Sequence, residues 1–243
     1  MDPAPAENHD SPDKISYHYK FIFSNGIGRE FNLALDRKTL NLISVPRDSY
    51  PEWAELKCFK CPNCSLGESK VRFCPIAVNL IELIDFFKTL LSYEEVEVLI
   101  ETEARRYMKH TTLQKGLSSL IGIYMVTSGC PVMDKLKPMV RHHLPFATLE
   151  ETRYRVISMY LLAQYFLFRR GRVPDWELKN LIKIYDDIRI VNKSFCKRLS
   201  EIKIKDASVN AVVILDTLAD FILFSMDKDT LKDMESQFSA YFK

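Results

Sequence analysis

Residues 15–35 read ISYHYKFIFSNGIGREFNLAL, and this stretch decides the fold class of the chain. Apolar and polar residues alternate on both sides of Asn25-Gly26, a dipeptide that favours a tight β-hairpin turn. Tyr17, Tyr19 and Phe21 therefore share one face of a strand, and the apolar residues after the turn share the matching face of a second strand. A further turn after Leu35 predicts a third short strand, so residues 15–44 are expected to form a three-stranded meander.

A second hairpin is predicted near residues 94–110, where Val96, Val98 and Ile100 alternate with acidic residues. From Thr111 onwards the apolar spacing is helical. Long helices are expected at roughly 149–171, 174–204, 207–226 and 229–241. Strands that precede helices in this way predict an α+β fold, in which a small antiparallel sheet packs on a mostly helical C-terminal half.

The chain has 243 residues, which is the size of one large domain or two small ones. Residues 1–13 contain three prolines, four acidic residues and no lysine or arginine, so they are expected to form a disordered tail. Residues 14–243 are then predicted to form a single α+β domain. An alternative subdivision separates a sheet and cysteine-rich segment at 14–145 from a helical bundle at 146–243.

The net charge of +2 gives no reason to expect a polyanionic partner. The apolar stretch Val156–Phe168 is too short for a membrane helix, and the stretch Ala207–Met226 is interrupted by two aspartates. No membrane partner is therefore expected. The N-terminal residues also lack the pattern of a secretory signal. A cytoplasmic location follows as the expectation, and its reducing conditions favour metal binding over disulfides for clustered cysteines.

Four of the six cysteines fall within residues 58–74, in the spacing Cys58-x2-Cys61-x2-Cys64-x9-Cys74. A two-residue loop between cysteines brings both sulfur atoms to the same side of a turn, within reach of one metal ion. The sequence therefore predicts a metal site with Cys61, Cys64 and Cys74 as its ligands.

The fourth ligand is open between Cys58, which continues the spacing, and Cys130, which is distant in sequence. Cys74 and Cys130 are each followed by proline and each opens a predicted helix. The positive end of a helix dipole lowers the pKa of a thiol and so favours the thiolate that binds metals. His143 is a further possible nitrogen ligand, although a histidine in this position also fits a helix C-terminus.

Zinc is the cofactor that these residues predict, with an iron–sulfur cluster as the alternative. Zinc fits the CPxC turn. The run of cysteines ending in Cys-Pro resembles ferredoxin-type spacing, but its x9 gap is longer. Buried free thiols without metal are the remaining interpretation. The favoured hypothesis is thus a metal-binding protein whose cysteine site is structural or redox-sensing.

Two other functions are compatible with the sequence. Cys130, at the turn into its helix, could be the reactive thiol of an enzyme. The basic helix predicted at 175–205 could contact nucleic acid through one lysine- and arginine-rich face. The residues of that face are Lys179, Lys183, Arg189, Lys193 and Lys197. No nucleotide-binding glycine loop, HExxH or GxSxG motif occurs, so no specific reaction is assigned and no protein partner is predicted.

Three stretches resemble a group of uncharacterised bacterial proteins. They are CPNCSL at 61–66, CPIAVNL at 74–80 and TSGCPVMDKLKPMVRHHLPFATLEET at 127–152. The resemblance implies a bacterial, cytoplasmic protein and brings no activity or site with it.

Overall fold

The computed structural model of the protein describes residues 13–226 and 228–243, so nearly all of the tail predicted at 1–13 lies outside the described residues. The strands are β1 (Lys14–Phe23), β2 (Gly28–Asp36), β3 (Glu95–Thr102) and β4 (Arg106–Thr112). They form one antiparallel sheet in the order β2-β1-β3-β4. The helices are α1 (Pro75–Phe87), α2 (Leu113–Thr127), α3 (Lys137–Arg141), α4 (Leu149–Arg169), α5 (Lys179–Ser200), α6 (Ala207–Phe224) and α7 (Lys228–Glu235), with short 3-10 helices η1 (Glu52–Ala54), η2 (Met133–Leu136) and η3 (Ser236–Tyr241). The predicted α+β class is confirmed.

The sheet has one apolar face and one polar face, as the alternating sequence predicts. Tyr19 stands opposite Phe31 on β2 and Ile100 on β3, and all three side chains are buried. On the opposite face His18 and Lys20 lie within 3.3 and 2.8 Å of the same Glu30 carboxylate. The apolar face therefore has to be covered by helices.

The predicted third strand of the meander is wrong. Leu42 forms only an isolated bridge with Leu35, and β1 pairs with β3 instead, so that β1 is central. The chain turns at Leu40, which has a φ of 58°. The Leu42 amide then donates to the carbonyl of Thr127 at the end of α2, 3.0 Å away. A partner from a distant helix thus takes the hydrogen bond that a longer strand would have used.

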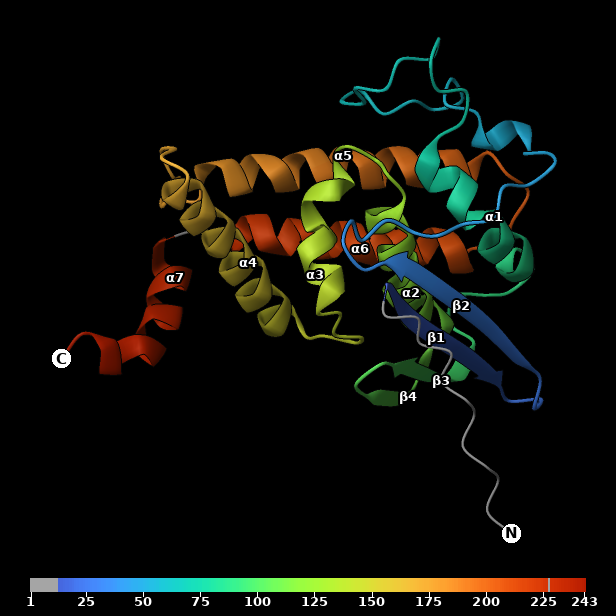
Figure 1. The fold of residues 1–243 in the computed structure, drawn as a ribbon. Coiled ribbons are helices and arrows are strands. Elements are labelled where there is room, and N and C mark those ends of the chain that lie inside the picture. The colour runs from blue at the N-terminus through green and yellow to red at the C-terminus, as the bar shows by residue number, and fades with distance from the viewer. Residues whose placement is uncertain (1–12, 227) are drawn as a thin grey trace.

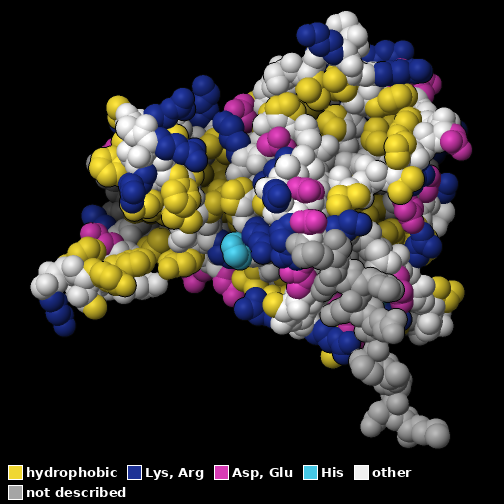
Figure 2. All heavy atoms as spheres, in the orientation of Figure 1, with side chains coloured by type: hydrophobic (Ala, Val, Ile, Leu, Met, Phe, Trp, Pro, Cys, Tyr) yellow, Lys and Arg dark blue, Asp and Glu magenta, His cyan; other side chains and the backbone are white. Residues whose placement is uncertain are grey.

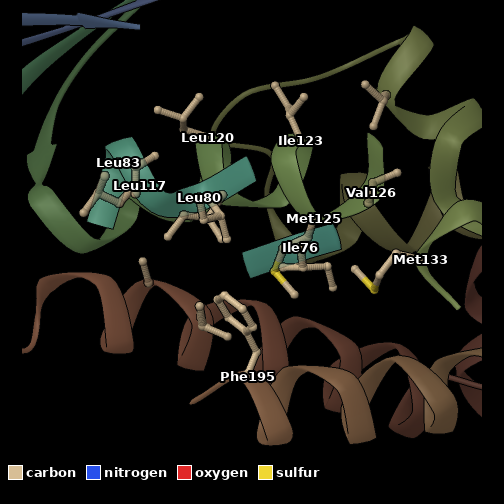
Figure 3. Close-up of a cluster of buried hydrophobic side chains, with 14 of the residues drawn as sticks. Ile76, Leu80, Leu83, Leu117, Leu120, Ile123, Met125, Val126, Met133 and Phe195 are labelled. Carbon is tan, nitrogen blue, oxygen red and sulfur yellow. The ribbon is translucent and has the colours of Figure 1, made fainter. Parts of the chain in front are cut away.

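Helix α2 lies between the sheet and the two long helices α5 and α6 (Figure 1). On its sheet side Gly116 allows close approach, because a Cβ there would stand 2.8 Å from a Val98 methyl. On its other side α2 packs against α6, which in turn packs against α5. Side chains of α1, α2 and α5 meet in one buried cluster that includes Leu80, Leu120 and Phe195 (Figure 3). The core therefore combines residues from both halves of the alternative subdivision.

The long helices lie close to their expected ranges, although several of their ends differ. Thr148 and Glu151 form the expected capping box at the start of α4. Helix α5 begins at Lys179 and not at Pro174, because the Asp175 carboxylate accepts hydrogen bonds from the Asn180 amide and the Tyr160 hydroxyl, both at 2.7 Å. Those bonds hold residues 174–178 in a separate turn. Helix α5 also ends at Ser200, before the expected boundary at 204.

Two helices leave apolar surface exposed in different ways. Hydrophobic side chains of α4, including Leu162, Phe166 and Phe168, are more than half exposed. Hydrophobic side chains gather on the side of the molecule that carries α4, at the left of the view (Figure 2). Among the described helices α6 alone is long and apolar enough to cross a membrane, and 33% of its residues 207–224 are buried. A core helix passes the same test, so the expected absence of a membrane partner stays a prediction.

Candidate functional site

The Cys61–Cys64 segment forms the tight turn that its sequence predicts. The Cys64 amide donates to the Cys61 carbonyl at 3.0 Å, which closes a four-residue β-turn. Within the turn, the Asn63 amide group donates to both the carbonyl and the carboxylate of Asp187, each at 3.0 Å. Because Asp187 belongs to α5, this pair of bonds fixes the turn against that helix.

Cys74 occupies the N-cap of α1, directly before Pro75 at the first helical position. Its amide donates to the Ala54 carbonyl at 2.8 Å, and its own carbonyl accepts from Val78 at 3.0 Å. The side chain is buried and makes no capping hydrogen bond. The backbone alone therefore holds the helix start, and the Cys74 thiol is left available for another role.

Cys130 follows the end of α2 through Gly129, whose φ of 88° suits glycine. Its sulfur atom receives backbone N–H groups from Val132 and Met133 as the chain turns into η2. Hydrogen bonds from backbone amides stabilise a negatively charged sulfur atom.

The three segments meet around one small cavity of about 20 Å³. Its lining includes the four cysteines Cys61, Cys64, Cys74 and Cys130. Helix α5 closes the cavity with Val191 and Arg198, and the segment that carries Cys61 passes over this helix (Figure 1). Neither Cys58 nor Cys196 lines it. Of the two candidates for a fourth ligand, the fold therefore brings Cys130 and not Cys58 to the other three.

Arg198 is the main electrostatic feature beside these thiols. Its side chain is 2% exposed. Its guanidinium donates to the carbonyls of Trp53, Glu55 (2.8 Å) and Phe59 (3.3 Å), all on the segment leading into the cysteine turn. No carboxylate among the described residues forms a salt bridge with it. The three carbonyl oxygens therefore compensate the buried guanidinium in place of a carboxylate.

Burial raises the pKa of two of these thiols, which favours their protonated form at neutral pH. Burial raises the pKa of Cys61 to about 11, although a hydrogen bond with Ser194 partly opposes it. Burial likewise raises the pKa of Cys130 above its usual value, against the two backbone N–H groups. This environment opposes a freely reactive Cys130 thiolate, and catalysis by that thiol stays an untested prediction.

Within residues 13–226 and 228–243, no three His, Cys, Asp or Glu side chains are arranged so that they could hold a metal ion without moving. The four thiols surround the cavity but do not converge on one point. Ligation would require their side chains to rotate, and Cys61 would have to leave its hydrogen bond with Ser194.

The other candidate residues lie elsewhere. His143 does not line the cysteine cavity; its Nε2 lies 2.7 Å from the Tyr19 hydroxyl and 3.3 Å from that of Ser119. Burial lowers the pKa of His143 to about 3. On the basic face of α5, Arg189 forms an ion pair with Asp220, which reduces the charge available for phosphate contacts. Nucleic-acid binding through that face stays untested.

The sequence interpretation missed the residues of α5 that support the site. Arg198 follows Phe195 by three positions and Val191 by seven, so it falls on the apolar face of its helix. A charged residue on such a face signals a specific buried partner. That signal was available from the periodicity, but the partners Trp53, Glu55 and Phe59 were not.

A family model described as Domain of unknown function (DUF6901) matches residues 16–239, which is nearly the whole chain. No curated protein and no solved structure gives a significant match. The match agrees with the resemblance to uncharacterised proteins and adds no activity.

Proposed function

The chain belongs to the DUF6901 family, whose function is unknown, and from this premise we propose that it binds a metal ion through four cysteine thiolates. The proposed ligands are Cys61, Cys64, Cys74 and Cys130. The observation that supports the proposal is their common lining of one cavity, although they come from three separate segments of the chain. Four free thiols meeting by chance in a core of this size would be unusual.

The dimensions of the cavity favour zinc over an iron–sulfur cluster. A volume of about 20 Å³ is little more than the space that one buried water molecule needs. A single tetrahedral ion with four sulfur ligands needs no more space. A cluster of several iron and sulfide atoms would require the turn at Cys61 to move away from α5.

The charges around the cavity suit a thiolate site. Zinc with four thiolates carries a net charge of −2, and Arg198 and Lys60 both line the cavity while no acidic residue does. The Cys130 sulfur also has two backbone N–H donors. Since burial raises the pKa of Cys61 and Cys130, metal binding would release protons from these two thiols, and the affinity would rise with pH.

The site would be structural or redox-sensing in its role. All four protein ligands close a tetrahedral shell, so no coordination position is left for a substrate. The metal would join the Cys61 turn, the start of α1 and the end of α2. Loss or oxidation of the thiolates would release these three segments from one another.

Metal analysis of anaerobically purified protein tests the proposal. We expect about one zinc per chain in the wild type and in the Cys58→Ser control, and a loss of zinc in Cys130→Ser. Replacement of zinc by cobalt should give the intense visible absorption of tetrahedral thiolate ligation. Iron with sulfide and a brown colour would instead establish the cluster.

Two results would overturn the proposal. One is a folded wild-type protein that contains no metal and takes up neither zinc, cobalt nor iron with sulfide under reducing conditions. The other is equal metal content in wild type and in Cys61→Ser and Cys130→Ser, because both variants remove a proposed ligand.

A further inference from the structure

A second, much larger cavity of about 470 Å³ lies among α2, α3, α4, α5 and α6. Its lining is mainly apolar, with Met133 and Met139 on one side and Leu215 and Leu218 of α6 on another. This volume falls in the range of small-molecule binding sites in proteins, roughly 300–1,000 Å³. Its lining includes none of the six cysteines, so it is separate from the proposed metal site.

One buried polar side chain on the cavity wall lacks a partner. Asn192 of α5 is 1% exposed, and its carboxamide oxygen has no hydrogen-bond donor among the described residues. Asn192 lies on the same helical face as Tyr185 and Ile188, which also line the cavity. A buried acceptor without a donor destabilises the fold, because it has lost its hydrogen bonds to water and gained none in return. The oxygen has almost no surface open to the cavity, so a ligand donor would reach it once the carboxamide rotates toward the cavity.

The charged groups at the cavity are all basic. Lys109, Lys115 and Arg155 line it, and no aspartate or glutamate does. Arg155 also donates to the carbonyls of Met139 and His142, at 3.0 and 2.8 Å, which fixes its guanidinium against the end of α3. The cavity therefore combines an apolar interior with a positively charged lining, a combination that matches an anionic amphiphile.

We propose that this cavity binds a carboxylate with a single acyl chain that carries a hydroxyl group. The chain lies against the apolar residues of α3 and α6. The carboxylate pairs with Lys109 and Lys115, which are exposed and so stand where the cavity opens. The chain hydroxyl donates to the Asn192 oxygen. A neutral or cationic amphiphile of the same length lacks the carboxylate, and an unsubstituted fatty acid lacks the donor.

Calorimetric titration of the full-length protein with four probes tests each part of this proposal. The probes are dodecanoate, hydroxydodecanoates with the hydroxyl at successive positions, dodecanol and dodecyl phosphate, all below their micelle concentrations. We expect dodecanoate to bind at least ten-fold more tightly than dodecanol. At least one hydroxy isomer should bind a further 5- to 10-fold more tightly, the equivalent of about one hydrogen bond. Dodecyl phosphate distinguishes a carboxylate site from a general site for anionic head groups.

Substitutions at the two ends of the site separate the contribution of the carboxylate to binding from that of the hydroxyl group. Lys109→Gln with Lys115→Gln changes only exposed side chains, and it should weaken dodecanoate about ten-fold while dodecanol is unaffected. Lys193→Gln, an exposed lysine of α5 outside the cavity, is the matched control and should change nothing. Asn192→Leu should abolish the advantage of the hydroxy isomer, and its fold is checked by circular dichroism.

The proposal is overturned if dodecanoate gives no binding, or if dodecanol binds as tightly as dodecanoate. It is also overturned if no hydroxy isomer exceeds dodecanoate, since Asn192 would then have no role. Unchanged affinity in the double lysine variant would contradict the placement of the carboxylate. Dodecyl phosphate binding more tightly than every carboxylate would assign the site to phosphate head groups instead.

Discussion

Replacing Arg198 by methionine should loosen the segment that carries the cysteine turn. Methionine keeps much of the apolar length of the side chain but removes every donor. The guanidinium supplies three hydrogen bonds to backbone carbonyls, at ~1.5–3 kcal/mol each for a charged donor. The cost of burying the charge offsets several kcal/mol of that sum. We therefore expect the free energy of unfolding to fall by about 3 kcal/mol.

Urea unfolding followed by circular dichroism measures this loss, with a chelator present so that no metal contributes. With an m-value of about 3 kcal/mol/M, the midpoint should fall by about 1 M. Hydrogen exchange gives the location: the amides of Leu56 and Cys74, which bond to Arg72 and Ala54, should exchange faster. Protection in α2 and α6 should decrease only as much as the global stability does.

Arg189→Met is the matched control, because Arg189 lies on the same helix but pairs with the exposed Asp220. Surface pairs contribute about 0–1 kcal/mol, so this variant should unfold close to the wild type. If Arg198→Met and Arg189→Met have the same midpoint, and Leu56 and Cys74 keep their protection, the reasoning is refuted. Water would then satisfy the three carbonyls, and Arg198 would not hold the segment.

Three further predictions concern other parts of the fold. The pKa of His143 is about 3 in the folded protein, against 6.5 in the unfolded chain. The free energy of unfolding should therefore fall by up to ~1.4 kcal/mol per pH unit below pH 6.5. His143→Gln should remove this slope when the stability is measured as a function of acid pH. Gly116→Ala should lower the free energy of unfolding by about 1–2 kcal/mol, measured by thermal unfolding, because its Cβ would meet the sheet. Gly122→Ala on the same helix is the control: the nearest atom to its Cβ would be 3.6 Å away, so this variant should be neutral or stabilising. The hydrogen bonds of Ser92 lower the pKa of Asp206, so the stability it contributes is present above about pH 4 and is lost as the pH falls further. The difference in unfolding midpoint between Asp206→Asn and the wild type should therefore shrink below pH 4, and a constant difference would contradict this assignment.

The hairpins and most helix starts were predictable because their signals are local. Asn25-Gly26 fixes the turn between β1 and β2, and Thr148 with Glu151 fixes the start of α4. The third strand was mispredicted because the hydrogen-bond partner of Leu42 comes from the end of α2. Strand pairing between β1 and β3 is also non-local, and no short motif encodes it.

The same contrast between local and non-local signals applies to the candidate site. Spacing alone predicted that Cys61, Cys64 and Cys74 lie together, and they do line one cavity, because a turn and a helix start are local structures. The choice between Cys58 and Cys130 depended on where α2 ends relative to α1, which only the packed fold decides. The large cavity left a trace at Asn192, a polar residue on an apolar helix face, but the helices that enclose it are far apart in the sequence.

The assembly of the cysteine cavity from three segments and α5 has a consequence for biosynthesis. Arg198 and Asp187 reach the cysteine segment only after most of the chain has been made, since both follow all four cysteines of the cavity in sequence. A nascent chain that has exposed Cys61 to Cys130 still lacks the helix against which they are ordered. Contacts of this kind form late and carry a large loop-closure cost. During synthesis the four thiols of the cavity therefore stay uncovered until α5 docks against them.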